Sequence, residues 1–129
     1  MKAREFLAQV RERGSYADQA ESEQVTRAVL GILAERLDGG TAKDVAAQLP
    51  EGLQDALLSA DKPGQSYGVE EFLRHVAAKL NTSTETAKWD ASAVLSTLAE
   101  AVTGGQLNKI LTQLPSGYAL LFGKPELSE

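Results

Sequence analysis

The fold is decided by residues 28–52, AVLGILAERLDGGTAKDVAAQLPEG, because the same pattern returns at residues 93–117 as AVLSTLAEAVTGGQLNKILTQLPSG. Aligned end to end, the two stretches share twelve identical positions, including a glycine pair and the Gln-Leu-Pro motif. Upstream, Glu5-Phe6-Leu7-x-x-Val10 returns as Glu71-Phe72-Leu73-x-x-Val76, with one position missing between the two repeated blocks. Chance similarity would not keep glycine and proline breakers in register, so the pattern predicts two copies of one supersecondary unit.

Each copy is predicted to form four helices and no sheet, because apolar residues recur at helical rather than alternating spacing. In the first copy the expected helices end at Gly14, at about Leu37 and near Leu49, and a fourth opens at Pro50. In the second copy they span about Val69–Leu80, continue from a Thr82/Glu85 capping box to about Val102, cover Gln106–Leu114 and follow Pro115.

The glycine pairs are interpreted as helix ends. Gly39-Gly40 and Gly104-Gly105 should stop the two long helices in the manner of a C-terminal glycine cap, with Thr41 capping the next short helix. The predicted architecture is all-α: two tandem four-helix repeats, residues 1–58 and 69–123, packed into one compact helical bundle. Residues 59–68 are the expected linker and 124–129 the expected tail.

Composition excludes several classes of protein. The chain has 129 residues, a net charge of −5 and no cysteine, which rules out disulfides, thiol catalysis and iron–sulfur clusters. No apolar run approaches the ~20 residues that span a membrane. The N-terminus lacks the apolar stretch of a secretory signal, so a cytoplasmic location is expected.

The repeated pattern resembles a known bacterial family. A Phe-x-x-x-Val helix, a long Ala-Val-Leu-x-x-Leu-Ala-Glu helix, Gly-Gly and then Gln-Leu-Pro, all present twice, are similar to the family named domain of unknown function 2267. The ending Leu114-Pro115-x-x-x-x-Leu120-Leu121-Phe122-Gly123 fits its second repeat. The resemblance covers about residues 3–123 and implies an all-helical duplicated fold, but no activity.

Catalytic and metal-binding patterns are weak. His75 is the only histidine, and its counterpart in the first copy is Gln9, so it is interpreted as a surface residue without special chemistry. A carboxylate metal site at Glu70, Glu71 and Asp90 is conceivable, although the Glu-x-x-His pairs of di-iron bundles are absent. The glycine pairs follow helices and lack the lysine of a phosphate-binding loop. No cofactor and no enzymatic activity are therefore expected.

The first helix carries a concentration of basic residues in an acidic protein: Lys2, Arg4, Arg11 and Arg13 flank its apolar stripe. Such flanking suits an anionic partner, either nucleic acid or a membrane surface. The alternative is a core-facing helix whose long side chains cover apolar surface while their charges stay in water. The negative net charge of both halves argues against nucleic acid.

Trp89 is the most distinctive side chain. It points roughly 160° away from the apolar face of its helix, counting 100° per residue, and its counterpart in the first copy is Gln24. Either it packs on the other repeat or the linker, or it is exposed and forms a contact surface, since tryptophan is enriched at the energetic centres of interfaces. Tyr118 is expected in the core with its hydroxyl in water.

These observations favour a non-enzymatic module that binds a protein partner or a second copy of itself. The alternative function is association with an anionic partner through the first helix. A third is an enzyme or small-ligand binder, which would need a pocket lined by convergent titratable groups.

Overall fold

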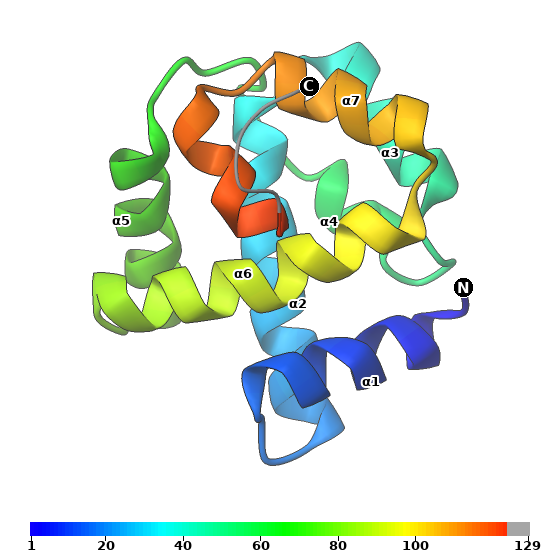
Figure 1. Ribbon diagram of the computed structural model, residues 1–129, viewed down its shortest axis with the longest axis vertical. Helices are drawn as coiled ribbons and strands as arrows, with labels where there is room; N and C mark the ends of the chain where they lie inside the picture. Colours follow the sequence, from blue (N-terminus) through cyan, green and yellow to red (C-terminus); the bar gives the residue numbers. More distant parts are fainter. Residues whose placement is uncertain (124–129) are drawn as a thin grey trace.

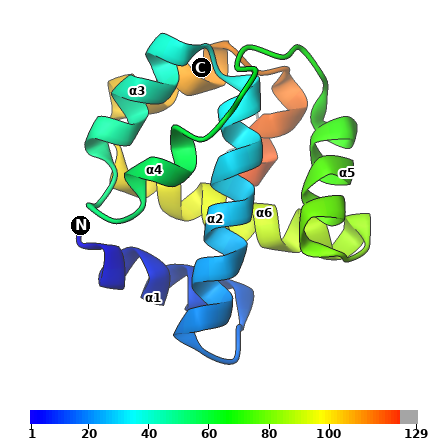
Figure 2. The same cartoon turned by 180° about the vertical axis from the view of Figure 1, so that it is seen from behind.

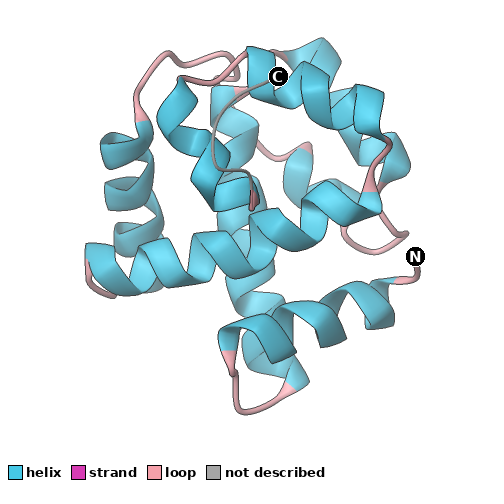
Figure 3. Cartoon of the chain, in the orientation of Figure 1, coloured by secondary structure: helices cyan, strands magenta, loops and turns pink. Residues whose placement is uncertain are grey.

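The computed structural model describes residues 1–123, which form helices and loops without a strand (Figure 3). The elements are α1 (Ala3–Gly14), α2 (Gln19–Arg36), α3 (Gly39–Gln48), α4 (Gln54–Leu57), α5 (Val69–Leu80), α6 (Thr84–Ala101), α7 (Gly104–Thr112) and a 3-10 helix, η1 (Ser116–Phe122). The predicted all-α class is confirmed, while the expected tail at 124–129 lies outside the described residues. None of the described helices is long and apolar enough to cross a membrane.

Two helices of 18 residues, α2 and α6, cross at the centre of the molecule (Figures 1 and 2). Helix α1 packs on both α2 and α6, and α5 likewise packs on both α6 and α2. Helices α3 and α7 lie side by side at one end (Figure 1). The first helix of each half therefore contacts the long helix of the other half, and a single hydrophobic core includes residues from both.

The bounds of the helices recur along the chain. Helices α1 and α5 have 12 residues each, and both begin and end at equivalent positions of the repeat. The same holds for α2 and α6, with 18 residues each. Helices α1 and α5 also end alike, because Ser15 and Asn81 take the left-handed conformation with φ of 57° and 56°.

The two halves exchange hydrogen bonds at the start of α3 and α7. Gln48 Oε1 accepts from the backbone N–H of Thr103 at 2.8 Å, and Gln113 Oε1 accepts from that of Asp38 at 3.1 Å. The two glutamines occupy equivalent positions of the repeat, and so do the two donors. The glutamine of each Gln-Leu-Pro motif thus binds the N-cap residue of the other half.

The glycine pairs do not end the long helices, contrary to the prediction. Leu37 follows α2 in an extended conformation, and Gly39-Gly40 opens α3. Asp38 is the N-cap, because its side chain accepts from the N–H of Thr41, the residue expected to be the cap. Thr103 caps α7 in the same way, ahead of Gly104-Gly105. Neither glycine pair has the positive φ that a C-terminal glycine cap requires.

Two further local predictions were wrong. The helix expected from Pro50 forms only at Gln54–Leu57, after a turn. The cap of α6 is Ser83, whose hydroxyl accepts from the N–H of Thr86, rather than Thr82. The expected extents of α5 and of the two long helices agree with the structure to within about a residue at their C-terminal ends.

Tyr118 is fully buried, as expected, and its ring lies edge-on to Phe72 with centroids 5.2 Å apart. Its hydroxyl is not in water, contrary to the prediction. It accepts from Arg36 Nε at 3.2 Å and lies 3.0 Å from the backbone oxygen of Tyr67, to which it can donate. Burial raises the pKa of Tyr118, which keeps the phenol protonated and able to donate.

Candidate functional site

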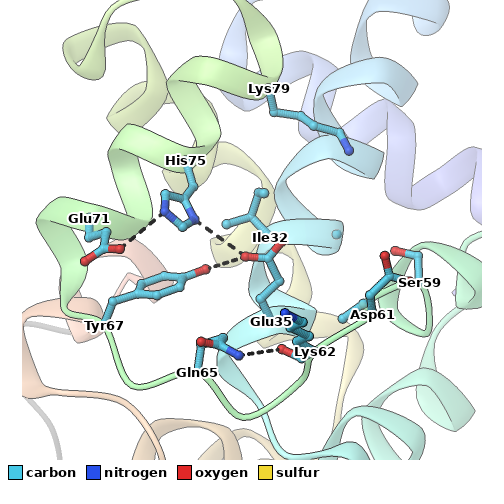
Figure 4. A pocket seen from close by; sticks show the side chains of 12 residues that line it. Ile32, Glu35, Ser59, Asp61, Lys62, Gln65, Tyr67, Glu71, His75 and Lys79 are labelled. Atoms are coloured by element: carbon cyan, nitrogen blue, oxygen red, sulfur yellow. Dashed lines mark hydrogen bonds and ion pairs between the residues drawn. The ribbon is translucent and has the colours of Figure 1, made fainter.

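A cleft of about 490 Å³ opens between α2, the loop at 59–68 and α5 (Figure 4). Three elements supply its lining: Gly31, Ile32 and Glu35 from α2; Ser59–Lys62, Gln65 and Tyr67 from the loop; and Glu71, His75 and Lys79 from α5. The three α5 residues are spaced by four, which places them along one face of that helix. Because α2, the loop and α5 all contribute charged side chains, the cleft contains more of them than either helix supplies by itself.

His75 lies between two carboxylates. Its Nδ1 is 3.5 Å from Glu35 Oε1 and its Nε2 is 3.4 Å from Glu71 Oε2 (Figure 4). Glu71 precedes His75 by one turn of α5, whereas Glu35 reaches across from α2. The imidazole thus connects the two helices that form the walls of the cleft.

Tyr67 holds Glu35 from the loop side. Its hydroxyl donates to Glu35 Oε1 at 2.9 Å, and its ring centroid lies 4.6 Å from that of His75. Burial and the hydrogen bond to Glu35 raise the pKa of Tyr67 far above its ordinary value. The phenol therefore remains a donor, and it fixes the orientation of the Glu35 carboxylate.

Arg36 lies beside the cleft and is 6% exposed. Its guanidinium lies 5.6 Å from the ring centroids of both Tyr67 and Tyr118. It donates to the backbone oxygens of Gln65, in the loop, and Gln113, at the end of α7. No carboxylate in the described chain pairs with it, so carbonyl oxygens and aromatic rings replace the water that a buried cation loses.

Three carboxylates, those of Glu35, Asp61 and Glu71, line the cleft together with the ammonium groups of Lys62 and Lys79. Ser59 donates to the backbone oxygen of Ala56 at 2.8 Å, and no hydrogen bond joins it to His75. Within residues 1–123, no group of three or more histidine, aspartate or glutamate side chains is placed to hold a metal ion. In particular, Asp90 lies in α6 beside Tyr16, so it does not join Glu70 and Glu71.

Trp89 lies elsewhere, where α6 meets the end of α1. Its indole is 57% exposed, and Nε1 donates to the backbone oxygen of Gly14 at 3.0 Å. The indole thus has a hydrogen bond to the other half of the molecule together with a large solvent-exposed surface. The sequence leaves open whether Trp89 packs on the other repeat or is exposed. In the structure it contacts the other half through its N–H and is exposed over much of its ring.

Asp90, the neighbour of Trp89, reaches the same turn. It is buried and accepts a hydrogen bond of 2.5 Å from the hydroxyl of Tyr16. Burial raises the pKa of Asp90, and the Tyr16 hydrogen bond partly opposes that shift. Gly14 makes room for this contact, since a Cβ there would overlap the Tyr16 ring. Trp89 and Asp90 together hold the turn that follows α1.

The four basic residues of the first helix differ in their surroundings. Arg13 binds Glu100 of α6 at 2.8 Å, and Arg11 donates to the backbone oxygen of Ala17 at 3.1 Å. Lys2 and Arg4 are exposed, and their side chains form no ion pair in the described chain. One of the four charges is therefore committed to an intramolecular ion pair, and anionic contact through the others stays a prediction.

Residues 3–121 match a family described as an uncharacterized conserved protein, DUF2267. The chain belongs to the DUF2267 family. This match confirms the resemblance drawn from the repeated motifs. No curated protein matches the chain.

The sequence pattern of this DUF2267 chain does not predict the cleft. It predicts that His75 is a surface residue without special chemistry, whereas the structure places the imidazole between two carboxylates. The spacing of Glu71, His75 and Lys79 along one helix face was a signal for one wall. Glu35 could not be found in this way, because it comes from the other half of the chain and lies far from His75 in the sequence.

Proposed function

We propose that this protein is a non-enzymatic module that binds another polypeptide chain through a surface centred on Trp89. The observation that carries the proposal is the exposed indole held at a fixed orientation by its hydrogen bond to Gly14. Tryptophan has a large area and few rotatable bonds, which makes it effective at the centre of an interface. An anchored ring also loses less conformational freedom when a partner covers it.

A comparison between the two halves supports the same surface. The first copy has Gln24 where the second has Trp89, so the shared helical architecture does not need an aromatic residue there. The partner is either a different protein or a second copy of this chain. An anionic partner bound through Lys2, Arg4 and Arg11 is the alternative function, and it differs by its steep dependence on salt.

The test compares Trp89→Gln, which installs the residue of the first copy, with Leu120→Ala, a control at another exposed apolar side chain (61%). Sedimentation velocity over a range of concentrations measures self-association. Affinity capture from lysate of the source organism, with nuclease, measures binding to other proteins. Trp89 is the only tryptophan, so its fluorescence emission reports directly on whether the indole becomes covered.

We expect the complex to be lost with Trp89→Gln and kept with Leu120→Ala, and the emission to shift to shorter wavelength on binding. A complex that survives Trp89→Gln would refute the proposed surface. Binding that disappears at moderate salt and with Arg4→Glu/Arg11→Glu would instead favour the anionic partner.

A further inference from the structure

The two halves of the chain place a glutamate of the long helix opposite a basic residue of a first helix. When the two copies are aligned, Glu35 corresponds to Glu100, and Lys79 corresponds to Arg13. Because α1 packs on α6 and α5 packs on α2, the two places are related by the internal repeat. The group bound at Glu100 on α6 therefore indicates which kind of group can bind at Glu35 on α2.

At the place on α6, a guanidinium is bound. Arg13 Nη2 lies 2.8 Å from Glu100 Oε2, and Nη1 lies 3.2 Å from both Ser96 Oγ and Thr97 Oγ1. One carboxylate and two hydroxyls thus surround the cation. The planar fork of arginine suits this set of acceptors, each in a fixed direction.

At the place on α2, no cation from the described chain is bound. The counterparts of Ser96 and Thr97 are Gly31 and Ile32, which have no hydroxyl, and Lys79 forms no ion pair with Glu35. Glu35 Oε1 is held by Tyr67 and His75, whereas Oε2 has no hydrogen-bond donor among residues 1–123. The cavity of about 490 Å³ adjoins this carboxylate.

We infer that the cleft between α2, the 59–68 loop and α5 binds the guanidinium group of a ligand, with Glu35 as the principal acceptor and Glu71 as the second. Ile32 and Ala60 provide apolar surface for the aliphatic chain that carries such a group. Lys62 and Lys79 also line the cleft, so the bound cation must compete with their charges. This inference does not depend on the Trp89 surface, which lies on α6.

The probe is N-acetyl-arginine amide, with N-acetyl-citrulline amide as its uncharged control. His75 is the only histidine and lies against both acceptors, so its imidazole C–H proton resonances report on the cleft in a one-dimensional NMR titration. We expect a saturable shift with the arginine compound and none with the citrulline compound. Equal shifts with both compounds, or no shift up to millimolar concentration, would overturn the inference.

Three variants test the residues. Glu35→Gln should weaken binding at least about tenfold, since a charge-assisted hydrogen bond is lost. Glu70→Gln, on the same helix as Glu71 but outside the cleft lining, should leave the affinity unchanged. Gly31→Ser/Lys79→Arg recreates the Arg13 arrangement with an internal guanidinium and should also weaken binding at least about tenfold. The nearest atom to a Cβ at Gly31 is Ser59 Oγ at 3.7 Å, so the serine has room.

A thermal unfolding curve for each variant establishes that it folds. Unchanged affinity in folded Glu35→Gln or in the double variant would refute the inference. The guanidinium belongs either to a free compound or to an arginine side chain of a partner protein. Titrations with agmatine and with an arginine-containing tetrapeptide distinguish these two sources. Tighter binding of agmatine indicates a free compound, and tighter binding of the peptide indicates an arginine side chain of a partner.

Discussion

Replacement of Arg36 by methionine tests whether this buried cation holds the two halves together. The guanidinium connects α2 to the loop at Gln65, to the end of α7 at Gln113 and to Tyr118. Arg36→Met leaves two part-buried backbone oxygens, those of Gln65 and Gln113, without this donor. Each loss costs about 1–2 kcal/mol, in the lower part of the range for a buried acceptor, because water can reach a part-buried oxygen. The variant also recovers several kcal/mol because no cation has to lose its water, and that recovery offsets the lost bonds to Tyr118 and the aromatic rings.

We therefore expect the free energy of unfolding to fall by about 2–4 kcal/mol, measured by urea denaturation at pH 7. At about 4 °C per kcal/mol for a domain of this size, the melting temperature should fall by about 8–16 °C. The slope against urea should stay the same, because the surface exposed on unfolding changes little.

Arg27→Met is the matched control in the same helix. Arg27 also has three partners, the side chains of Glu23 and Asp55 and the backbone oxygen of Gly52, but its side chain is substantially exposed. Exposed ion pairs contribute little, so this variant should lose at most about 1 kcal/mol. If Arg36→Met and Arg27→Met lose the same free energy, burial of the Arg36 guanidinium is not what makes its contacts important.

Three further predictions concern the helix ends and the buried carboxylate. Burial raises the pKa of Asp90 in the folded state, so the folded state binds more protons than the unfolded state does. The free energy of unfolding of the wild type, relative to that of Asp90→Asn, should therefore increase as the pH falls from 7 to 4. Urea denaturation of both proteins at each pH measures this difference. Gly14→Ala should displace the Tyr16 ring and cost about 1–3 kcal/mol by the same assay, and a loss below about 0.5 kcal/mol would show that the turn adjusts freely. The backbone N–H of Thr41 lowers the pKa of Asp38, so Asp38→Ala should lower the free energy of unfolding by about 1 kcal/mol at pH 7. This difference from wild type should shrink as the pH falls below the ordinary pKa of aspartate. A difference that persists in acid would refute the capping role.

The sequence predicted the helices better than their ends. A regular apolar stripe, preceded by a loop with proline and glycine, predicts a helix at Val69–Leu80, and α5 has these bounds. The predicted role of Gly39-Gly40 is wrong, because a glycine pair is compatible with the end of one helix or the start of the next. The buried side chain of Leu37 and the N-cap hydrogen bond of Asp38 decide between these roles.

In the candidate sites, too, the sequence predicts the direction of a side chain but not the residues that it contacts. The sequence alone identified Trp89 as a residue that the apolar face of α6 does not use, because the direction of a side chain on a helix follows from its position. It could not identify the hydrogen bond of Trp89 to Gly14, or the contact of His75 with Glu35, since both join residues of different halves.

The sequence by itself determined the all-α class, the recurring order of helices and the apolar face of each helix, because periodicity and breaker residues act over a few positions. Only the tertiary structure decided that α1 packs on α6 and α5 on α2, and hence which polar side chains meet. Those side-chain contacts depend on how whole faces of the helices pack against each other. A glutamate that is one of many surface charges in the sequence therefore becomes the principal acceptor of a cleft in the folded chain.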